Sequence, residues 1–171
     1  HNGSIRVESA GTGKGTAFIV TLPLSGPVAE TPVNVESPEA NEPRLDGVRV
    51  LVVDDEQDAR DLIGRALEDR GATITVADNS RDAIDLLERR DFDVLLADIA
   101  MPEEDGYSLI RRVRSSQEGN LASIPAAAVT AHARDDERRR ALAEGYQVHV
   151  AKPVEPFELV RTVNFLAHDR R

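Results

Sequence analysis

The sequence predicts an α/β fold in which five helices wind around both faces of a five-stranded parallel sheet. Residues 46–168 carry this signal, because short apolar runs alternate there five times with longer stretches of helical periodicity. The first run, Val48–Val53, is almost continuously apolar, as expected of a strand that is covered on both faces. Strict alternation of strands and helices indicates a doubly wound parallel sheet with right-handed crossovers.

Each predicted strand is a short run rich in valine, isoleucine, leucine or alanine, bounded by polar or turn-forming residues. The five strands are Val48–Val53, Ala72–Ala77, Val94–Ala97, Ile124–Thr130 and Val148–Ala151.

The stretches after the first, second, third and fifth strands carry apolar residues at helical spacing. Gly71 is predicted to end the first helix, and Ser80 to cap the N-terminus of the second. The residues expected on the buried faces are Ala59, Leu62, Ile63, Ala66 and Leu67, then Ala83, Ile84 and Leu87, then Leu109, Ile110 and Val113, and finally Leu159, Val160, Val163 and Leu166.

The helix predicted after the fourth strand, at about residues 134–144, differs from the others. Leu142 is its only large apolar residue. We therefore expect this helix to be weakly anchored to the sheet, because burial of an apolar face supplies most of a helix's attachment.

The first 45 residues have a different composition, and divide the chain into three regions. Residues 1–24 alternate as strands do around the glycine-rich segment Gly11–Gly15, which predicts a β-hairpin. Residues 25–45 contain four prolines among acidic and polar residues, so we expect a semi-extended linker with little buried surface. Residues 46–168 form the α/β domain.

Composition excludes several classes of function. The net charge of −10 disfavours non-specific nucleic-acid binding, which needs a basic face. The absence of cysteine excludes disulfides and thiolate metal sites, and it fits a cytoplasmic location. No apolar run is long enough to cross a membrane, and no secretory signal opens the sequence. We expect no nucleic-acid partner and no membrane contact within this chain.

Polar side chains stand at the carboxyl ends of four predicted strands, the edge where open α/β sheets bind ligands. They are Asp54, Asp55, Asp98, Thr130 and Lys152. Two unit charges about 4 Å apart near a protein surface interact by roughly 4 kcal/mol, so the clustered carboxylates require a cation, a proton or an ammonium. Oxygen ligands suit Mg²⁺. The sequence therefore predicts a magnesium site at this edge.

A carboxylate beside bound Mg²⁺ can attack a phosphoryl group and form an aspartyl-phosphate. A lysine ammonium would neutralise the phosphoryl oxygens, and a threonine hydroxyl would donate a hydrogen bond to one of them. Taken singly, each of these residues has an ordinary structural explanation as a turn former, helix cap or solvated side chain. Together, at the ends of separate strands, they predict a site with Asp98 as phosphoacceptor and Lys152 and Thr130 as catalytic groups.

The ordered motifs resemble the receiver domain of bacterial two-component systems over nearly all of residues 47–168. The motifs are Val50-Leu51-Val52-Val53-Asp54-Asp55-Glu56, Asp98-Ile99-Ala100-Met101-Pro102, Asp105-Gly106, Val129-Thr130-Ala131 and Val150-Ala151-Lys152-Pro153.

The resemblance implies a flavodoxin-like strand order, 2-1-3-4-5, and transfer of phosphate to Asp98 from a phosphohistidine on a histidine kinase or histidine phosphotransfer domain. It implies that Asp55, Asp98 and the carbonyl of Ala100 ligate Mg²⁺, with Asp54 acting largely through water. It also implies a cis peptide bond before Pro153.

The resemblance further implies that Thr130 moves toward the new phosphate while an aromatic side chain on the fifth strand swings inward. His149 occupies that position here. A histidine could make the switch sensitive to pH near 6.5, or it could be half-buried with no switching role. Glu104 also departs from the family pattern, in which an apolar residue is usual.

Residues 1–24 resemble the final strands of a histidine-kinase ATP-binding domain, where a glycine-rich turn precedes the last strand. The chain is then expected to be the C-terminal piece of a hybrid sensor kinase, whose parent could be membrane-anchored and could pass phosphate to a downstream phosphorelay protein. We expect no kinase activity from this chain, since it lacks the ATP-binding boxes and a phosphorylatable histidine motif. A hairpin without this ancestry is the alternative.

Other functions on the same fold fit less well. A phosphatase of the haloacid-dehalogenase type needs a second acid two residues after the nucleophile, where this chain has Ala100. A flavodoxin-like cofactor binder needs a hydroxyl- and glycine-rich loop after the first strand, and Asp54, Asp55 and Glu56 would repel its phosphate. A degenerate receiver that acts only as a docking module remains open.

Overall fold

The computed structural model describes residues 4–9, 15–21, 43–117, 121–131 and 135–168. The chain forms two compact units, His1–Ser37 and Pro38–Arg171. Most of the linker predicted at 25–45 lies outside the described residues. No helix in the described part of the chain is both long enough and apolar enough to cross a bilayer.

The larger unit contains a five-stranded parallel sheet with the strand order β4-β3-β5-β6-β7. This order confirms the predicted 2-1-3-4-5. The strands are β3 (Arg49–Val53), β4 (Thr73–Ala77), β5 (Val94–Asp98), β6 (Ala126–Thr130) and β7 (Val148–Ala151).

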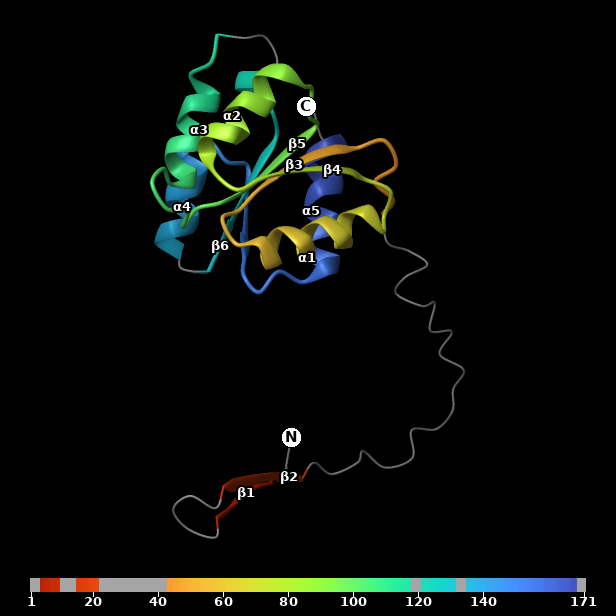
Figure 1. Cartoon of the computed structure of the whole chain (residues 1–171), viewed down its shortest axis with the longest axis vertical. Helices are drawn as coiled ribbons and strands as arrows, with labels where there is room; N and C mark the ends of the chain where they lie inside the picture. Colours follow the sequence, from red (N-terminus) through yellow and green to blue (C-terminus); the bar gives the residue numbers. More distant parts are fainter. Residues whose placement is uncertain (1–3, 10–14, 22–42, 118–120, 132–134, 169–171) are drawn as a thin grey trace. The chain divides into compact units, whose positions relative to one another are not determined.

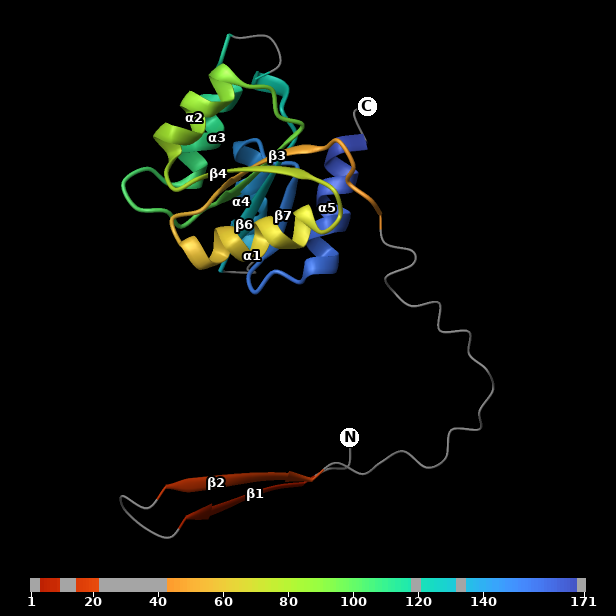
Figure 2. The same ribbon diagram turned by 45° about the vertical axis from the view of Figure 1, so that its right-hand side comes forward.

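Helices cover both faces of this sheet (Figure 1). On one face lie α1 (Gln57–Glu68) and α5 (Pro156–His168), and on the other α2 (Ser80–Arg89), α3 (Gly106–Arg114) and α4 (Asp135–Glu144), with the short turn η2 (Leu121–Ser123) before β6. The same division is visible after a 45° rotation (Figure 2). Every residue of β5 and β6 is buried, which explains why these strands are apolar up to their last residues, Asp98 and Thr130.

Two details of the first two helices correct the sequence predictions. Leu62 is 59% exposed instead of buried, because the buried stripe of α1 is narrow and is formed by Ile63, Gly64 and Leu67. The N-cap of α2 is Asn79 instead of Ser80: the Asn79 side chain accepts a hydrogen bond from the Asp82 amide at 2.8 Å. Ser80 is the first helical residue, and its side chain bonds elsewhere.

Helix α4 buries little apolar surface, in keeping with its sparse apolar face. Ala141 is its buried residue, and Leu142 is 42% exposed. Polar contacts with α3 supplement this small apolar interface: the Arg140 guanidinium lies 4.0 Å from the centre of the Tyr107 ring, and Glu144 accepts a hydrogen bond from Arg111 at 3.0 Å.

The core of the larger unit begins at Leu45, one residue earlier than the predicted boundary. Its side chain is completely buried in the cluster between the sheet, α1 and α5, and its amide donates to the Arg70 carbonyl at 2.8 Å. The expectation of little buried surface in residues 25–45 is therefore wrong at this residue. Leu45 lies four residues before β3 and still packs into the core, which the proline-rich composition of residues 25–45 does not indicate.

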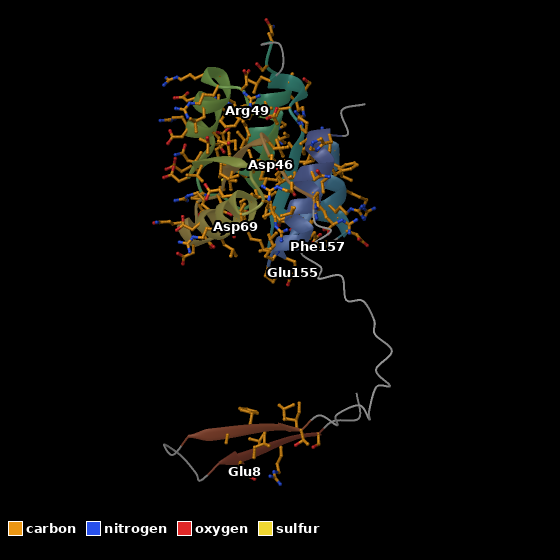
Figure 3. All side chains as sticks on the ribbon, turned by 90° about the vertical axis from the view of Figure 1, so that its right-hand side faces the viewer. Glu8, Asp46, Arg49, Asp69, Glu155 and Phe157 are labelled. Atoms are coloured by element: carbon orange, nitrogen blue, oxygen red, sulfur yellow. The ribbon has the colours of Figure 1, made fainter. Side chains whose placement is uncertain are left out.

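The smaller unit contains the predicted hairpin strands, β1 (Ser4–Ser9) and β2 (Thr16–Thr21), paired antiparallel. The glycine-rich segment between them lies mostly outside the described residues. Side chains stand on both faces of this ribbon, with Glu8 on one of them (Figure 3). The cross-strand pairs Ile5–Val20 and Val7–Phe18 share a face, and all four side chains are more than half exposed.

Candidate functional site

The carboxyl ends of four strands bring the predicted site residues to one edge of the sheet. Asp54 follows β3, Asp98 ends β5, Thr130 ends β6, and Lys152 follows β7. Parallel pairing of neighbouring strands sets this convergence, since Asp98 is in register with Val129 on β6. The site residues come together because the carboxyl ends of parallel strands all lie at the same edge of the sheet.

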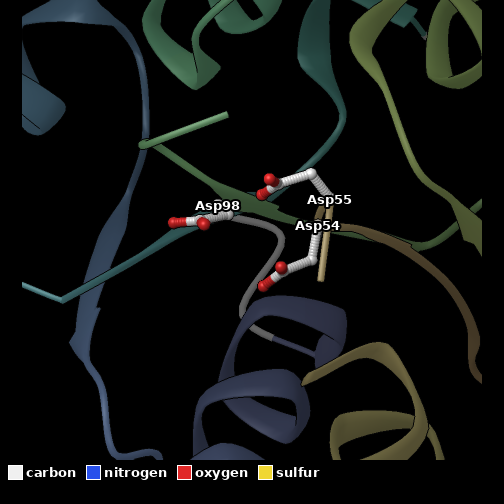
Figure 4. A group of neighbouring side chains, drawn as sticks. All are labelled: Asp54, Asp55 and Asp98. Atoms are coloured by element: carbon white, nitrogen blue, oxygen red, sulfur yellow. The ribbon is translucent and has the colours of Figure 1, made fainter. Parts of the chain in front are cut away.

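The three aspartates gather over this edge, and their side chains lie side by side (Figure 4). One carboxylate oxygen from each of Asp54, Asp55 and Asp98 lies within 4.8 Å of the others. Asp54 and Asp98 are buried, with 1% and 5% exposure, whereas Asp55 is exposed. The cluster therefore combines two desolvated charges with one that faces water.

Lys152 links the two buried aspartates. Its ammonium donates to Asp54 Oδ2 at 2.7 Å and to Asp98 Oδ2 at 3.0 Å. Burial alone would lower the pKa of Lys152, but the hydrogen bonds to Asp54 and Asp98 outweigh burial and raise it above the ordinary value of 10.5. Lys152 is therefore fully charged at neutral pH.

The donor set fits a hard divalent cation. Three carboxylates and one ammonium leave two negative charges in a site built of oxygen atoms, the ligands that Mg²⁺ prefers. The Ala100 amide donates to Asp98 Oδ1 at 3.3 Å, so the predicted carbonyl ligand belongs to a residue that touches the cluster.

The loop after Asp98 is held by contacts on both sides. The Ser80 hydroxyl donates to the Glu104 carbonyl at 3.0 Å, and the Glu104 carboxylate accepts from Arg112 at 3.1 Å. The Glu104 side chain, which departs from the family pattern, therefore forms a partly exposed ion pair with α3. Gly106 permits a close approach of α3, because a Cβ atom at this position would collide with the Asp98 carbonyl.

Asp105 caps the N-terminus of α3 by accepting a hydrogen bond from the Ser108 amide at 2.8 Å. Burial raises the pKa of Asp105, but the hydrogen bonds from Ser108 and the nearby Arg111 and Arg140 together hold it below the ordinary value of 3.8.

We expect Asp105→Ala to cost about 0.5–2 kcal/mol of unfolding free energy at neutral pH, and Asp105→Asn to cost much less, because asparagine is also a good cap. Since the folded-state pKa is depressed, the charge contribution is complete above pH 3.8 and is lost as the pH falls through the folded-state pKa. Urea unfolding over a pH series measures both effects. An unchanged pH dependence in Asp105→Asn would contradict the assignment.

The two residues predicted to switch lie on neighbouring strands. Thr130 is buried, and its carbonyl accepts from the Lys152 amide at 2.7 Å. His149 is half-buried and in register with Ala128, on the face of the sheet that carries α2, α3 and α4. Its Nε2 atom is buried, with no hydrogen-bond partner among the described residues.

The Lys152–Pro153 peptide bond is cis, as the resemblance implied.

The sequence did not predict two arginines that bind the backbone around the site. Arg60 on α1 donates to the Asp54 carbonyl at 2.6 Å, and Arg114 on α3 donates to carbonyls before β6 and β7. Neither has a distinguishing signal in a chain where arginine supplies almost all the basic residues.

Known proteins resemble the larger unit. A sequence model of the family "Response regulator receiver domain" matches residues 50–164. The receiver domain of Francisella response regulator 1452 superimposes with a TM-score of 0.67 at 27% identity, covering 72% of this chain and 99% of that structure.

Curated relatives include both short and long proteins. A 14.6 kDa uncharacterized protein of Leptolyngbya boryana is 49% identical over 114 residues, which cover 67% of this chain and 86% of that protein. Sensor protein GacS of Pseudomonas syringae pv. syringae is 34% identical over 116 residues, covering 67% of this chain and 13% of GacS. Hybrid signal transduction histidine kinase D of Dictyostelium discoideum is 31% identical over 138 residues, which cover 76% of this chain and 9% of that kinase. The chain thus spans only a small part of the two sensor proteins.

Proposed function

Because this chain belongs to the response regulator receiver domain family of two-component signalling, we propose that Asp98 is its phosphoacceptor. The observation that supports this most strongly is the Lys152 ammonium, which bridges the buried carboxylates of Asp54 and Asp98 at 2.7 and 3.0 Å. A buried acid that lies at a strand end beside a cation and two more acids is suited to phosphoryl transfer.

Mg²⁺ would be held by Asp55, Asp98 and the Ala100 carbonyl, with Asp54 acting largely through water. When bound, it would neutralise charge on the phosphoryl oxygens during transfer. The exposed Asp55 supports this, since it gives the ion a ligand that can be reached from solvent.

In the proposed reaction a carboxylate oxygen of Asp98 attacks the phosphorus of a phosphohistidine on a partner. The nitrogen–phosphorus bond breaks, the histidine nitrogen keeps the bonding electron pair, and an acyl phosphate forms on Asp98. Lys152 stabilises the negative charge on the phosphoryl group, and the Thr130 hydroxyl donates a hydrogen bond to one of its oxygens. The donor is a histidine kinase or a histidine phosphotransfer domain.

Phosphorylation would then change the surface around α4. Thr130 would move toward the phosphoryl group, and His149 on the adjacent strand would follow. The small buried area of α4 supports this, because little apolar packing resists a shift of that helix.

We also propose that the chain is part of a hybrid sensor kinase, with residues 1–24 as the end of its ATP-binding domain, 25–44 as a linker and 45–168 as the receiver, since Leu45 belongs to the receiver core. Similarity to GacS and to a hybrid histidine kinase supports this context. The exposed pairs Ile5–Val20 and Val7–Phe18 support it too, because a two-stranded hairpin is marginally stable unless its apolar face packs on something else. Such a receiver would act in the cytoplasm and could hand its phosphoryl group to a downstream phosphorelay protein.

Incubation with Mg²⁺ and acetyl phosphate tests the phosphoacceptor. We expect the wild type to gain one acid-stable, base-labile phosphoryl group, visible as an 80 Da mass increase. Asp98→Asn should gain none, while the exposed α1 variant Asp61→Asn should label normally. An unlabelled wild type would favour a receiver used only for docking.

A further inference from the structure

We infer that Arg60 is a positioning residue for the acid pair Asp54–Asp55, acting through the backbone carbonyl that joins them. The inference rests on the proposed magnesium-dependent function of this site. It concerns a residue on α1 that lies beside the cluster and contributes no ligand atom to it.

Asp54 is bonded through each of its polar atoms. Its amide donates to the Ala77 carbonyl on β4 at 3.2 Å, and Oδ1 accepts from the Glu56 amide at 3.0 Å. Oδ2 accepts from Lys152 at 2.7 Å. The carbonyl oxygen accepts from Arg60 Nη1 at 2.6 Å, the shortest of these four bonds. Bonds from β4, from the start of α1 and from the segment after β7 thus fix one buried residue.

Asp55 has a different environment. It is exposed, and none of the hydrogen bonds of the described residues involves its side chain. Its position therefore depends on the backbone that carries it, which begins with the peptide group between Asp54 and Asp55. The oxygen of that peptide group is the atom that Arg60 holds. Loss of this bond would let the group rotate and move the Asp55 carboxylate relative to Asp98.

The placement of Arg60 makes this contact possible. Its amide donates to the Glu56 carbonyl at 3.1 Å in the first turn of α1, so the guanidinium can reach back to the end of β3. It also lines a surface groove of about 400 Å³ with Asp78, Asp82 and Asp85. These acids offset part of its positive charge.

Positioning and electrostatics make opposite predictions for this residue. A guanidinium near the site repels Mg²⁺, so a purely electrostatic role means that Arg60→Met tightens magnesium binding and Arg60→Lys leaves it unchanged. A positioning role means that Arg60→Met weakens binding, with Arg60→Lys intermediate, since lysine keeps a donor but lacks the planar fork. Supports behind metal ligands typically change affinity by about 10- to 100-fold.

Magnesium titration calorimetry on the full chain decides between them. We expect the Kd of Arg60→Met to rise about 10-fold, that of Arg60→Lys to rise less, and that of Arg89→Met to stay within about twofold. Arg89 is a matched control, since it lines the same groove from α2 and has no contact with Asp54 among those described. Unchanged or tighter binding in Arg60→Met overturns the inference.

A second readout needs no metal. Hydrogen exchange at the Glu56 amide, which donates to Asp54 Oδ1, should accelerate in metal-free Arg60→Met and stay unchanged in Arg89→Met. Equal protection in both variants overturns the positioning role. If the wild type binds Mg²⁺ but acetyl phosphate does not label it, the proposed function fails while the comparison of arginine variants still stands.

Discussion

Replacing Lys152 with methionine is expected to lower the unfolding free energy of the metal-free protein by about 3–5 kcal/mol, since removing one member of a buried ion pair strands its partner charge. Here two carboxylates would be stranded, because Asp54 and Asp98 are 1% and 5% exposed and both bond to the ammonium. The same variant should slow labelling by acetyl phosphate by roughly 100-fold, as found when a donor to developing negative charge is lost.

Urea unfolding with and without Mg²⁺ measures the stability effect. We expect saturating Mg²⁺ to reduce the loss in Lys152→Met, because the ion neutralises the same carboxylates, and matched ionic strength in NaCl to do so much less. Arg44→Met is the control: it removes the exposed pair Arg44–Asp46, which should contribute less than about 1 kcal/mol. Equal losses in the two variants would mean that the Lys152 bridge contributes no more than a surface pair.

Replacing Arg114 with methionine is expected to cost at least about 3 kcal/mol, because it strands several half-buried carbonyl groups, each costing roughly 1–3 kcal/mol. The guanidinium donates to the Gly145 carbonyl at 2.8 and 3.0 Å, and to the Ala122 and Ile124 carbonyls at 3.0 and 2.8 Å. Burial lowers the pKa of Arg114, and arginine nonetheless stays charged at neutral pH.

The neighbouring arginine provides the control for this prediction. Arg112 is exposed and pairs with Glu104, so Arg112→Met should cost less than about 1 kcal/mol. In Arg114→Met, hydrogen exchange should accelerate in residues 121–126 and 145–148, the segments that the guanidinium joins. Equal unfolding free energies for the two variants would show that the carbonyls find other partners. Arg114→Lys should recover only part of the loss, since one ammonium cannot replace the planar fork.

Much of the fold could be read from local patterns. Strands covered on both faces are mostly apolar, so the runs that became β5 and β6 were recognisable with nearly correct limits. Ser80 was wrongly predicted as the N-cap of α2 because adjacent polar residues can each serve as the cap. Leu62 was wrongly predicted as buried because a leucine at the edge of a helix's apolar stripe can face either the core or water. Only packing settles such choices.

The acids, threonine and lysine of the site were also predicted from the sequence, because parallel topology alone brings the carboxyl ends of strands to one edge. Sequence by itself therefore determined the fold class, the strand order implied by the family motifs, and the residues gathered around Asp98. Only the tertiary structure decided what holds them there: Lys152 bridging two buried aspartates, Arg60 on the Asp54 carbonyl, and Arg114 joining α3 to the segments before β6 and β7. These are bonds from side chains to the backbone or to buried charges, and they join residues that are six to 98 positions apart. Their partners are chosen by geometry in three dimensions, and no spacing along the chain encodes them.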